Sequence, residues 1–163
     1  MPPNQSAYRK YHSTETALTH VFSNTIEELD KGNLVLLTML DLSAAFDCVD
    51  HEILLNRLKR SYGIQSIAHS WIKSYLTDRT QRVHHNGQMS HRVKMYYGVP
   101  QGSVLGHLLF LLYTADINYI VDNHSLRSHY YADDIPLQTP CTPTSSQQQL
   151  ARDKTVRCID DIN

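Results

Sequence analysis

The sequence lacks a strong charge imbalance and has few cysteines. Its 163 residues contain 15 Lys and Arg against 16 Asp and Glu, a formal net charge of −1. Lys and Arg supply most of the non-specific affinity of proteins for nucleic acids, so this balance does not by itself indicate a nucleic-acid-binding protein. Cys48, Cys141 and Cys158 show no Cys-x-x-Cys spacing. That absence argues against a zinc site or a disulfide framework and favours a reducing, intracellular setting, without choosing between nucleus and cytoplasm.

The sequence also lacks the features of membrane targeting. Residues 1–5 have neither the basic nor the apolar region of a signal peptide. The most apolar stretch, residues 104–113, is too short to cross a bilayer, so we expect no membrane partner. With 41% hydrophobic and 19% charged residues, the composition is that of an ordinary globular domain with an adequate core.

Three acidic residues stand at the ends of apolar runs. Asp41 follows the run at 34–40, which predicts a strand buried on both faces. Asp133 and Asp134 separate two extended-type runs, which places them at the tip of a predicted hairpin. If the three carboxylates converge, their oxygens suit Mg²⁺ and phosphoryl-transfer chemistry. Each motif alone also has a plainer interpretation, a solvated turn for the acid pair and a helix cap for Asp41.

The remaining pattern predicts a mixture of helices and one hairpin. Asn86 and Gly87 are a strong turn signal between extended runs at 79–85 and 91–97. Apolar periodicity and end signals predict helices at 13–32, 50–62 and 66–76, with Ile53, Leu54 and Leu58 facing inward. A further helix, from Ser103 to about residue 120, is predicted to be the central buried helix. A loop to Gln149 and a short terminal helix are expected to follow.

Four motifs in a fixed order resemble a known family. Residues 41–47, 49–51, 98–106 and 131–134 are similar to the palm motifs of reverse transcriptases from retrotransposons that lack long terminal repeats, the LINE-like elements. Residues 71–81 and the early segments at 5–10 and 12–14 are also similar to that family. The resemblance covers roughly residues 5–138, and its order and spacing make a chance match in another α/β domain improbable.

The resemblance implies an α+β fold. This would be a polymerase palm, a ferredoxin-like sheet with packed helices, together with partial fingers and no thumb. We expect residues 1–33 to be a partial fingers helix region, 34–140 the palm core with a hairpin insertion, and 141–163 a loop and an incomplete terminal helix. The family pattern extends beyond both ends, so we expect a truncated fragment.

The resemblance also implies roles for individual residues. Asp41 and Asp133 would bridge two Mg²⁺ ions, or Mn²⁺, with Asp134 and the Leu42 carbonyl completing the site. The Phe46 ring would lie beneath the nucleotide sugar and disfavour a ribose 2′-hydroxyl; core packing is the alternative. Gln101 and Gly102 would lie under the nucleotide and template, although a turn before a helix explains them equally. The implied partners are an RNA template, a DNA primer and deoxynucleoside triphosphates.

Departures from the family pattern keep other interpretations open. His107 stands where the family usually has proline, and Ile135-Pro136-Leu137 replaces Thr-Gln-Leu, so Pro136 is expected to weaken its strand. The favoured function is a partial reverse transcriptase domain that is inactive as an isolated chain. A non-catalytic remnant with weak nucleic-acid binding or an interaction role is the alternative. A different phosphotransferase such as a nucleotide cyclase is disfavoured, because Gln101-Gly102 precedes the acidic hairpin and no glycine-rich cyclase signature is present.

Overall fold

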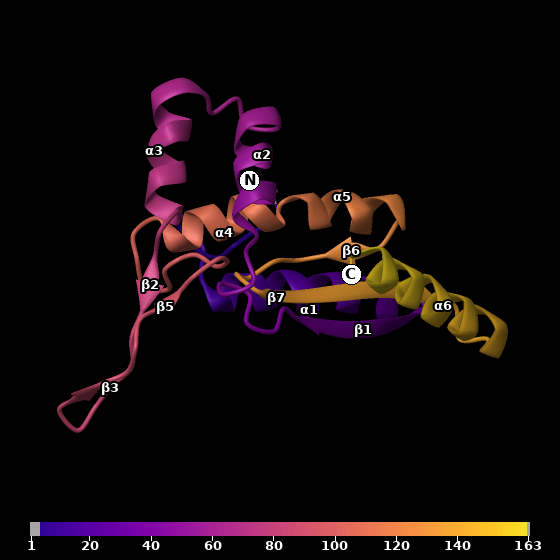
Figure 1. Ribbon diagram of the computed structural model, residues 1–163. Helices are drawn as coiled ribbons and strands as arrows, with labels where there is room; N and C mark the ends of the chain where they lie inside the picture. The colour runs from indigo at the N-terminus through magenta and orange to yellow at the C-terminus, as the bar shows by residue number, and fades with distance from the viewer. Residues whose placement is uncertain (1–3, 163) are drawn as a thin grey trace. The chain divides into compact units, whose positions relative to one another are not determined.

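The computed structural model describes residues 4–162 and combines helices with antiparallel sheets (Figure 1). The expected α+β class is therefore confirmed as a mixture of helices and antiparallel sheets. The chain divides into two compact units, one formed by Met1–Ser43 with Thr114–Asn163 and the other by Ala44–Tyr113. The division into fingers and palm segments rests on roles rather than on contacts and stays a prediction.

The first unit is built on a three-stranded antiparallel sheet. Strands β1 (Leu34–Asp41) and β6 (Arg127–Ser128) flank the central strand β7 (Asp134–Cys141). On one face of β7, Ile135 and Leu137 join a buried cluster that also contains Val121, Leu126, Tyr130 and Cys158. Val121 lies in helix α5 (Asp116–Asn123), Cys158 lies in helix α6 (Ser145–Ile162), and Leu126 and Tyr130 lie on either side of β6.

Helix α1 (Thr14–Asp30) packs on the opposite face of this sheet. Its N-terminus is closed by a capping box in which Ser13 and Thr16 bond reciprocally, and Gly32 follows it at φ +77°. Gln138 projects from β7 on the face opposite Leu137, and its amide donates to Val21 O at 2.9 Å and to Thr25 Oγ1 at 2.7 Å. The predicted first helix is confirmed, with both ends set by local signals.

The burial predicted for β1 is wrong. The strand lies at the edge of its sheet, and Leu37 and Met39 are 47% and 60% exposed. A continuous apolar run is typical of a doubly buried strand. It does not specify whether helices cover both faces, because that depends on segments far away in the sequence.

Pro136 does not shorten its strand. β7 runs for eight residues and pairs along its full length with β1, although it contains Pro136 and Pro140. The carbonyl of Pro136 accepts from His129 N on the β6 side, at 3.2 Å. Since alternate residues bond to opposite neighbours, both prolines turn their missing N–H groups away from β1. The ladder with β1 therefore loses no donor.

The second unit contains a helical pair and a long hairpin. Helix α2 (His51–Arg60) packs against α3 (Ser66–Leu76), and α4 (Gly106–Thr114) supplies the most apolar helix. Leu54 and Leu58 are fully buried as predicted, whereas Ile53, predicted to be inward, is 46% exposed. The hairpin is formed by β2 (Thr80–Gln81) with β5 (Val93–Lys94), and by β3 (His84–His85) with β4 (Gln88–Met89).

Two predicted elements differ from the structure. The helix expected from Ser103 to residue 120 begins at Gly106 and is interrupted at Ala115, so it forms α4 and α5. The loop expected up to Gln149 ends earlier, because α6 starts at Ser145 and has 18 residues. Glutamine is a good helix former, so a Ser- and Gln-rich composition did not exclude a helix here. Among residues 4–162, none of the helices combines the length and apolarity needed to span a bilayer.

Candidate active site

Two of the three predicted acids, Asp41 and Asp134, are direct neighbours across the sheet. Asp41, the last residue of β1, lies opposite Asp134, the first residue of β7. The N–H and C=O of Asp134 both bond to Tyr131, at 3.0 and 2.9 Å, and therefore face away from β1. Asp41 and Asp134 thus form a non-hydrogen-bonded pair, the class in which facing side chains approach most closely. Both side chains are exposed, so two carboxylates stand side by side at the open end of the sheet.

The third acid occupies the hairpin tip, as predicted from the turn sequence. The reciprocal Tyr131 and Asp134 hydrogen bonds leave Ala132 and Asp133 as a two-residue loop. Ala132 has φ +56°, a conformation that tight hairpins normally assign to glycine. A side chain held at positive φ stores strain, and surrounding contacts must maintain it.

An N-terminal segment, residues 4–7, hydrogen-bonds to the strand that precedes Ala132 and Asp133. Ser6 N donates to Tyr130 O and Tyr130 N donates to Asn4 O, both at 2.9 Å, so the segment runs parallel to the first hairpin strand. The buried Gln5 side chain accepts from Ala7 N at 2.8 Å and from Ala132 N at 3.4 Å. Gln5 therefore contacts the strained residue of the tip.

Histidines on the same face form a cluster that the sequence did not reveal. The Ser6 hydroxyl lies 2.9 Å from His129 Nε2 and 3.2 Å from His12 Nδ1, and His20 stacks on His129 with ring centroids 5.5 Å apart. Burial lowers the pKa of His129, and the neighbouring His20 and His12 lower it further. These residues are distant in sequence and follow no ligand spacing, so no pattern in the sequence indicated the cluster.

The described residues do not hold a preassembled metal cage. Within residues 4–162, no group of three or more His, Cys, Asp or Glu side chains is arranged to bind a metal ion. The arrangement is a close carboxylate pair with Asp133 on the adjoining turn. Oxygen donors of this kind fit a hard cation that takes its other ligands from water and substrate phosphates. Convergence of all three acids on one ion stays a prediction.

The other predicted site residues belong to the second unit. Phe46 is half-buried and stacks on the buried Phe110 ring, with centroids 4.6 Å apart. It is therefore anchored in packing but not enclosed. Gln101 and Gly102 are exposed in the turn before α4, and Gly102 has φ +78°, which accounts for glycine at that position.

Two motifs of the family pattern meet within this unit. Gly98 N donates to Val49 O and Val99 N donates to Phe46 O, both at 2.8 Å. A Cβ atom on Gly98 would lie 2.9 Å from the Asp47 backbone, so only glycine permits this approach. The Gly98 carbonyl also accepts from Arg79 at 2.6 Å and lies 2.8 Å from His51 Nε2. The role of Arg79 was not predicted, because its partner is remote in sequence.

Comparison with known proteins identifies the family. Residues 1–156 match the reverse transcriptase (RNA-dependent DNA polymerase) family, and the chain belongs to it. The family assignment made from the motifs is confirmed, and its relatives come from LINE-like elements.

Individual relatives are similar at moderate identity. The chain is 32% identical over 142 residues to a probable RNA-directed DNA polymerase from transposon BS of Drosophila melanogaster, covering 84% of the chain and 16% of that protein. It is 32% identical over 144 residues to the RNA-directed DNA polymerase from mobile element jockey of the same species, covering 85% and 16%. A Pol polyprotein from element R2 of Popillia japonica is 32% identical over 80 residues, covering 49% and 13%. The chain thus spans about a sixth of the length of the first two relatives.

Proposed function

We propose that this chain carries the catalytic carboxylates of a reverse transcriptase palm and serves RNA-templated DNA synthesis within a larger parent protein. The observation that carries the proposal is the Asp41 and Asp134 pair beside the Asp133 turn. Two carboxylates in a close cross-strand pair repel each other, so the pair is unfavourable as a purely structural element. A bound divalent cation would remove that cost.

Asp41, Asp133 and Asp134, with the Leu42 carbonyl, would hold Mg²⁺ or Mn²⁺. Bound in pairs, such ions lower the pKa of an attacking hydroxyl and neutralise the phosphates in phosphoryl transfer. The exposed position of Asp41 and Asp134 leaves them accessible to a triphosphate. The hydrogen-bonded hairpin tip keeps the backbone of these carboxylates fixed. A fixed backbone suits phosphoryl transfer better than a mobile loop would, because alignment of the reacting groups supplies much of the reaction rate.

Phe46, Gln101 and Gly102 are proposed to contact the nucleotide and the template. The stack on Phe110 fixes the Phe46 ring, which supports a role as a rigid steric gate against the ribose 2′-hydroxyl. The exposed Gln101 amide and the side-chain-free Gly102 would permit close approach of a nucleic-acid strand.

We expect the isolated 163-residue chain not to extend a primer. A net charge of −1 supplies little phosphate affinity, and carboxylates without aligned primer and template give slow chemistry. The alternative is a non-catalytic remnant of such a polymerase, with at most weak nucleic-acid binding or an interaction role.

A chimera distinguishes a catalytically competent palm from a non-catalytic remnant. Residues 4–141 would replace the aligned segment of the jockey polymerase, and primer extension on an RNA template would be measured with Mg²⁺ and with Mn²⁺. Catalytic competence predicts extension by the chimera and its loss in Asp133→Asn, with Asp47→Asn as the matched control. A folded chimera without activity, beside an active parent, would establish the remnant interpretation.

A further inference from the structure

The hairpin of the second unit, residues 79–97, concentrates positive charge. It contains four Lys and Arg residues and no Asp or Glu, which leaves eleven basic against sixteen acidic residues in the rest of the chain. The near-neutral net charge of the chain therefore conceals an uneven distribution of positive charge. A local basic surface can bind phosphates even when the net charge of the protein is not positive.

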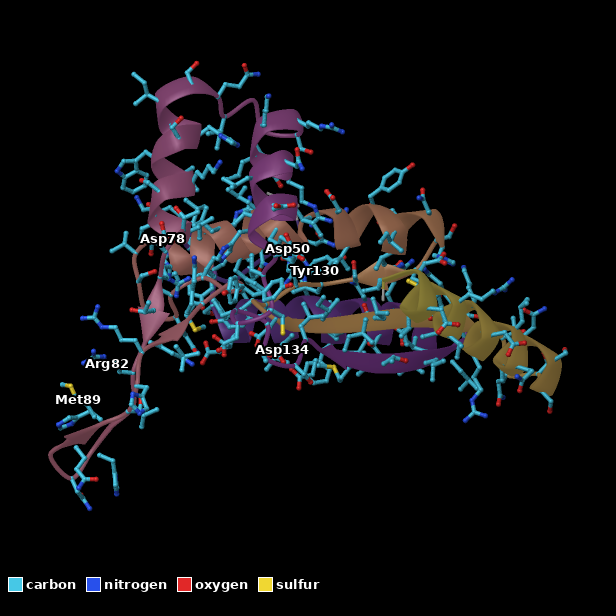
Figure 2. The ribbon with its side chains drawn as sticks, in the orientation of Figure 1. Asp50, Asp78, Arg82, Met89, Tyr130 and Asp134 are labelled. Atoms are coloured by element: carbon cyan, nitrogen blue, oxygen red, sulfur yellow. The ribbon has the colours of Figure 1, made fainter. Side chains whose placement is uncertain are left out.

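The hairpin is a defined structure. Asn86 and Gly87 have φ values of +47° and +76°, as a type I′ turn requires. Val83 O accepts from Ser90 N at 2.9 Å between the two short ladders, and Arg79 O accepts from Met95 N at 2.8 Å at the base of the hairpin, so the two strands stay together along its length. Nearly every side chain along it is exposed (Figure 2).

Its charges divide into two groups. Arg79 donates to Gly98 O and Lys94 pairs with Asp78 at 3.1 Å, so both have partners within the unit. Arg82 and Arg92 are the next residues beyond the β2 and β5 ladder on either strand, and neither pairs with a carboxylate anywhere in residues 4–162. Arg82 donates only a long hydrogen bond, 3.7 Å, to the Met89 sulfur. Like charges on neighbouring strands are destabilising, so ion pairing within the fold does not account for the two arginines.

We propose that Arg82 and Arg92 form an interface for the phosphodiester backbone of a single nucleic-acid strand. Guanidinium groups bind phosphate oxygens with two parallel hydrogen bonds. Tyr96 and Tyr97, at the base of the hairpin, are 67% and 56% exposed and can stack on bases. The inference deepens the proposed polymerase function but needs no metal and no catalysis.

The expected effect follows from counterion release. For single strands, each neutralised phosphate contributes about −0.7 to the slope of log K against log salt. Arg82→Gln/Arg92→Gln should therefore reduce the slope by about 1.4, a loss of about 25-fold at 0.1 M salt that shrinks to about 3-fold at 0.5 M. Neutralising charges that do not touch the strand should change the slope far less.

Fluorescence anisotropy of the full chain with labelled RNA and DNA strands of one sequence tests this inference. EDTA is present throughout, and salt is varied from about 50 to 500 mM. The matched control is Lys59→Gln/Arg60→Gln, which removes two exposed positive charges at the end of α2. Circular dichroism checks that each variant is folded.

Three results would overturn the inference: no detectable binding by the wild-type chain, an unchanged slope in the hairpin variant, or an equal loss in the α2 control. Comparing the RNA and DNA arms tells whether template or primer chemistry is preferred. Binding in EDTA needs no metal ion held by the carboxylates, so a failure of catalysis in the chimera and a failure of this interface remain distinguishable.

Discussion

The close pairing of Asp41 and Asp134 predicts that removing either charge stabilises the metal-free protein. Directly opposed side chains have Cβ atoms about 5 Å apart, and two unit charges at that separation in water repel by about 0.8 kcal/mol. Screening reduces this to about 0.7 kcal/mol at 0.01 M salt, about 0.4 at 0.15 M and below about 0.2 at 1 M. Asp41→Asn should therefore stabilise the fold at low salt, and the gain should vanish as salt rises.

Urea unfolding at several salt concentrations measures this effect. A double-mutant cycle with Asp134→Asn isolates the pair, and the coupling energy should equal the salt-dependent repulsion. Asp47→Asn, which removes an exposed acid elsewhere, is the control with the same change in net charge. A coupling energy of zero at low salt would refute the assignment of a close pair.

The same variants test metal affinity. With a dissociation constant near 10 mM, adding about 10 mM Mg²⁺ stabilises the wild type by about 0.4 kcal/mol through mass action. We expect no more than that without nucleotide, because Mg²⁺ relies on substrate phosphates for part of its coordination. Asp41→Asn should abolish the effect. Tight binding that survives Asp133→Asn would place the ion elsewhere.

Three further outcomes are expected. The lowered pKa of His129 means that the folded state binds fewer protons than the unfolded state, so the free energy of unfolding should fall as pH drops through about 6.5. His129→Gln should flatten this decline, whereas substitution of the exposed His91 by Gln should not. Burial raises the pKa of Tyr130 to about 12, while the nearby Ser128 side chain lowers it. The buried hydroxyl forms no well-aligned hydrogen bond within the described chain, so Tyr130→Phe should leave urea stability unchanged or raise it by up to about 1 kcal/mol. Gln5→Ala should speed amide hydrogen exchange at Ala132, and unchanged protection there would exclude Gln5 as the support of the hairpin tip.

Much of the local structure was predictable from the sequence. Ser13 and Gly32 bound the first helix, Asp50 caps the second, and Asn86-Gly87 makes its turn, because each signal acts through neighbouring backbone groups. The motifs also identified the family, since their order in the chain is itself the signal. Convergence of three acids on a metal, by contrast, was expected from the family and remains a prediction.

Tertiary structure decided what depends on distant partners. The apolar run of β1 could not reveal that the strand lies at an edge, and the sequence of β7 could not reveal that its two prolines face away from β1. The register that sets Asp41 against Asp134 arises from pairing across more than ninety residues of chain. The support of the tip by Gln5 and the cluster around His129 have the same origin. Short-range sequence signals fix where elements begin and end, whereas burial, register and side-chain partners are set by packing between segments that the sequence keeps apart.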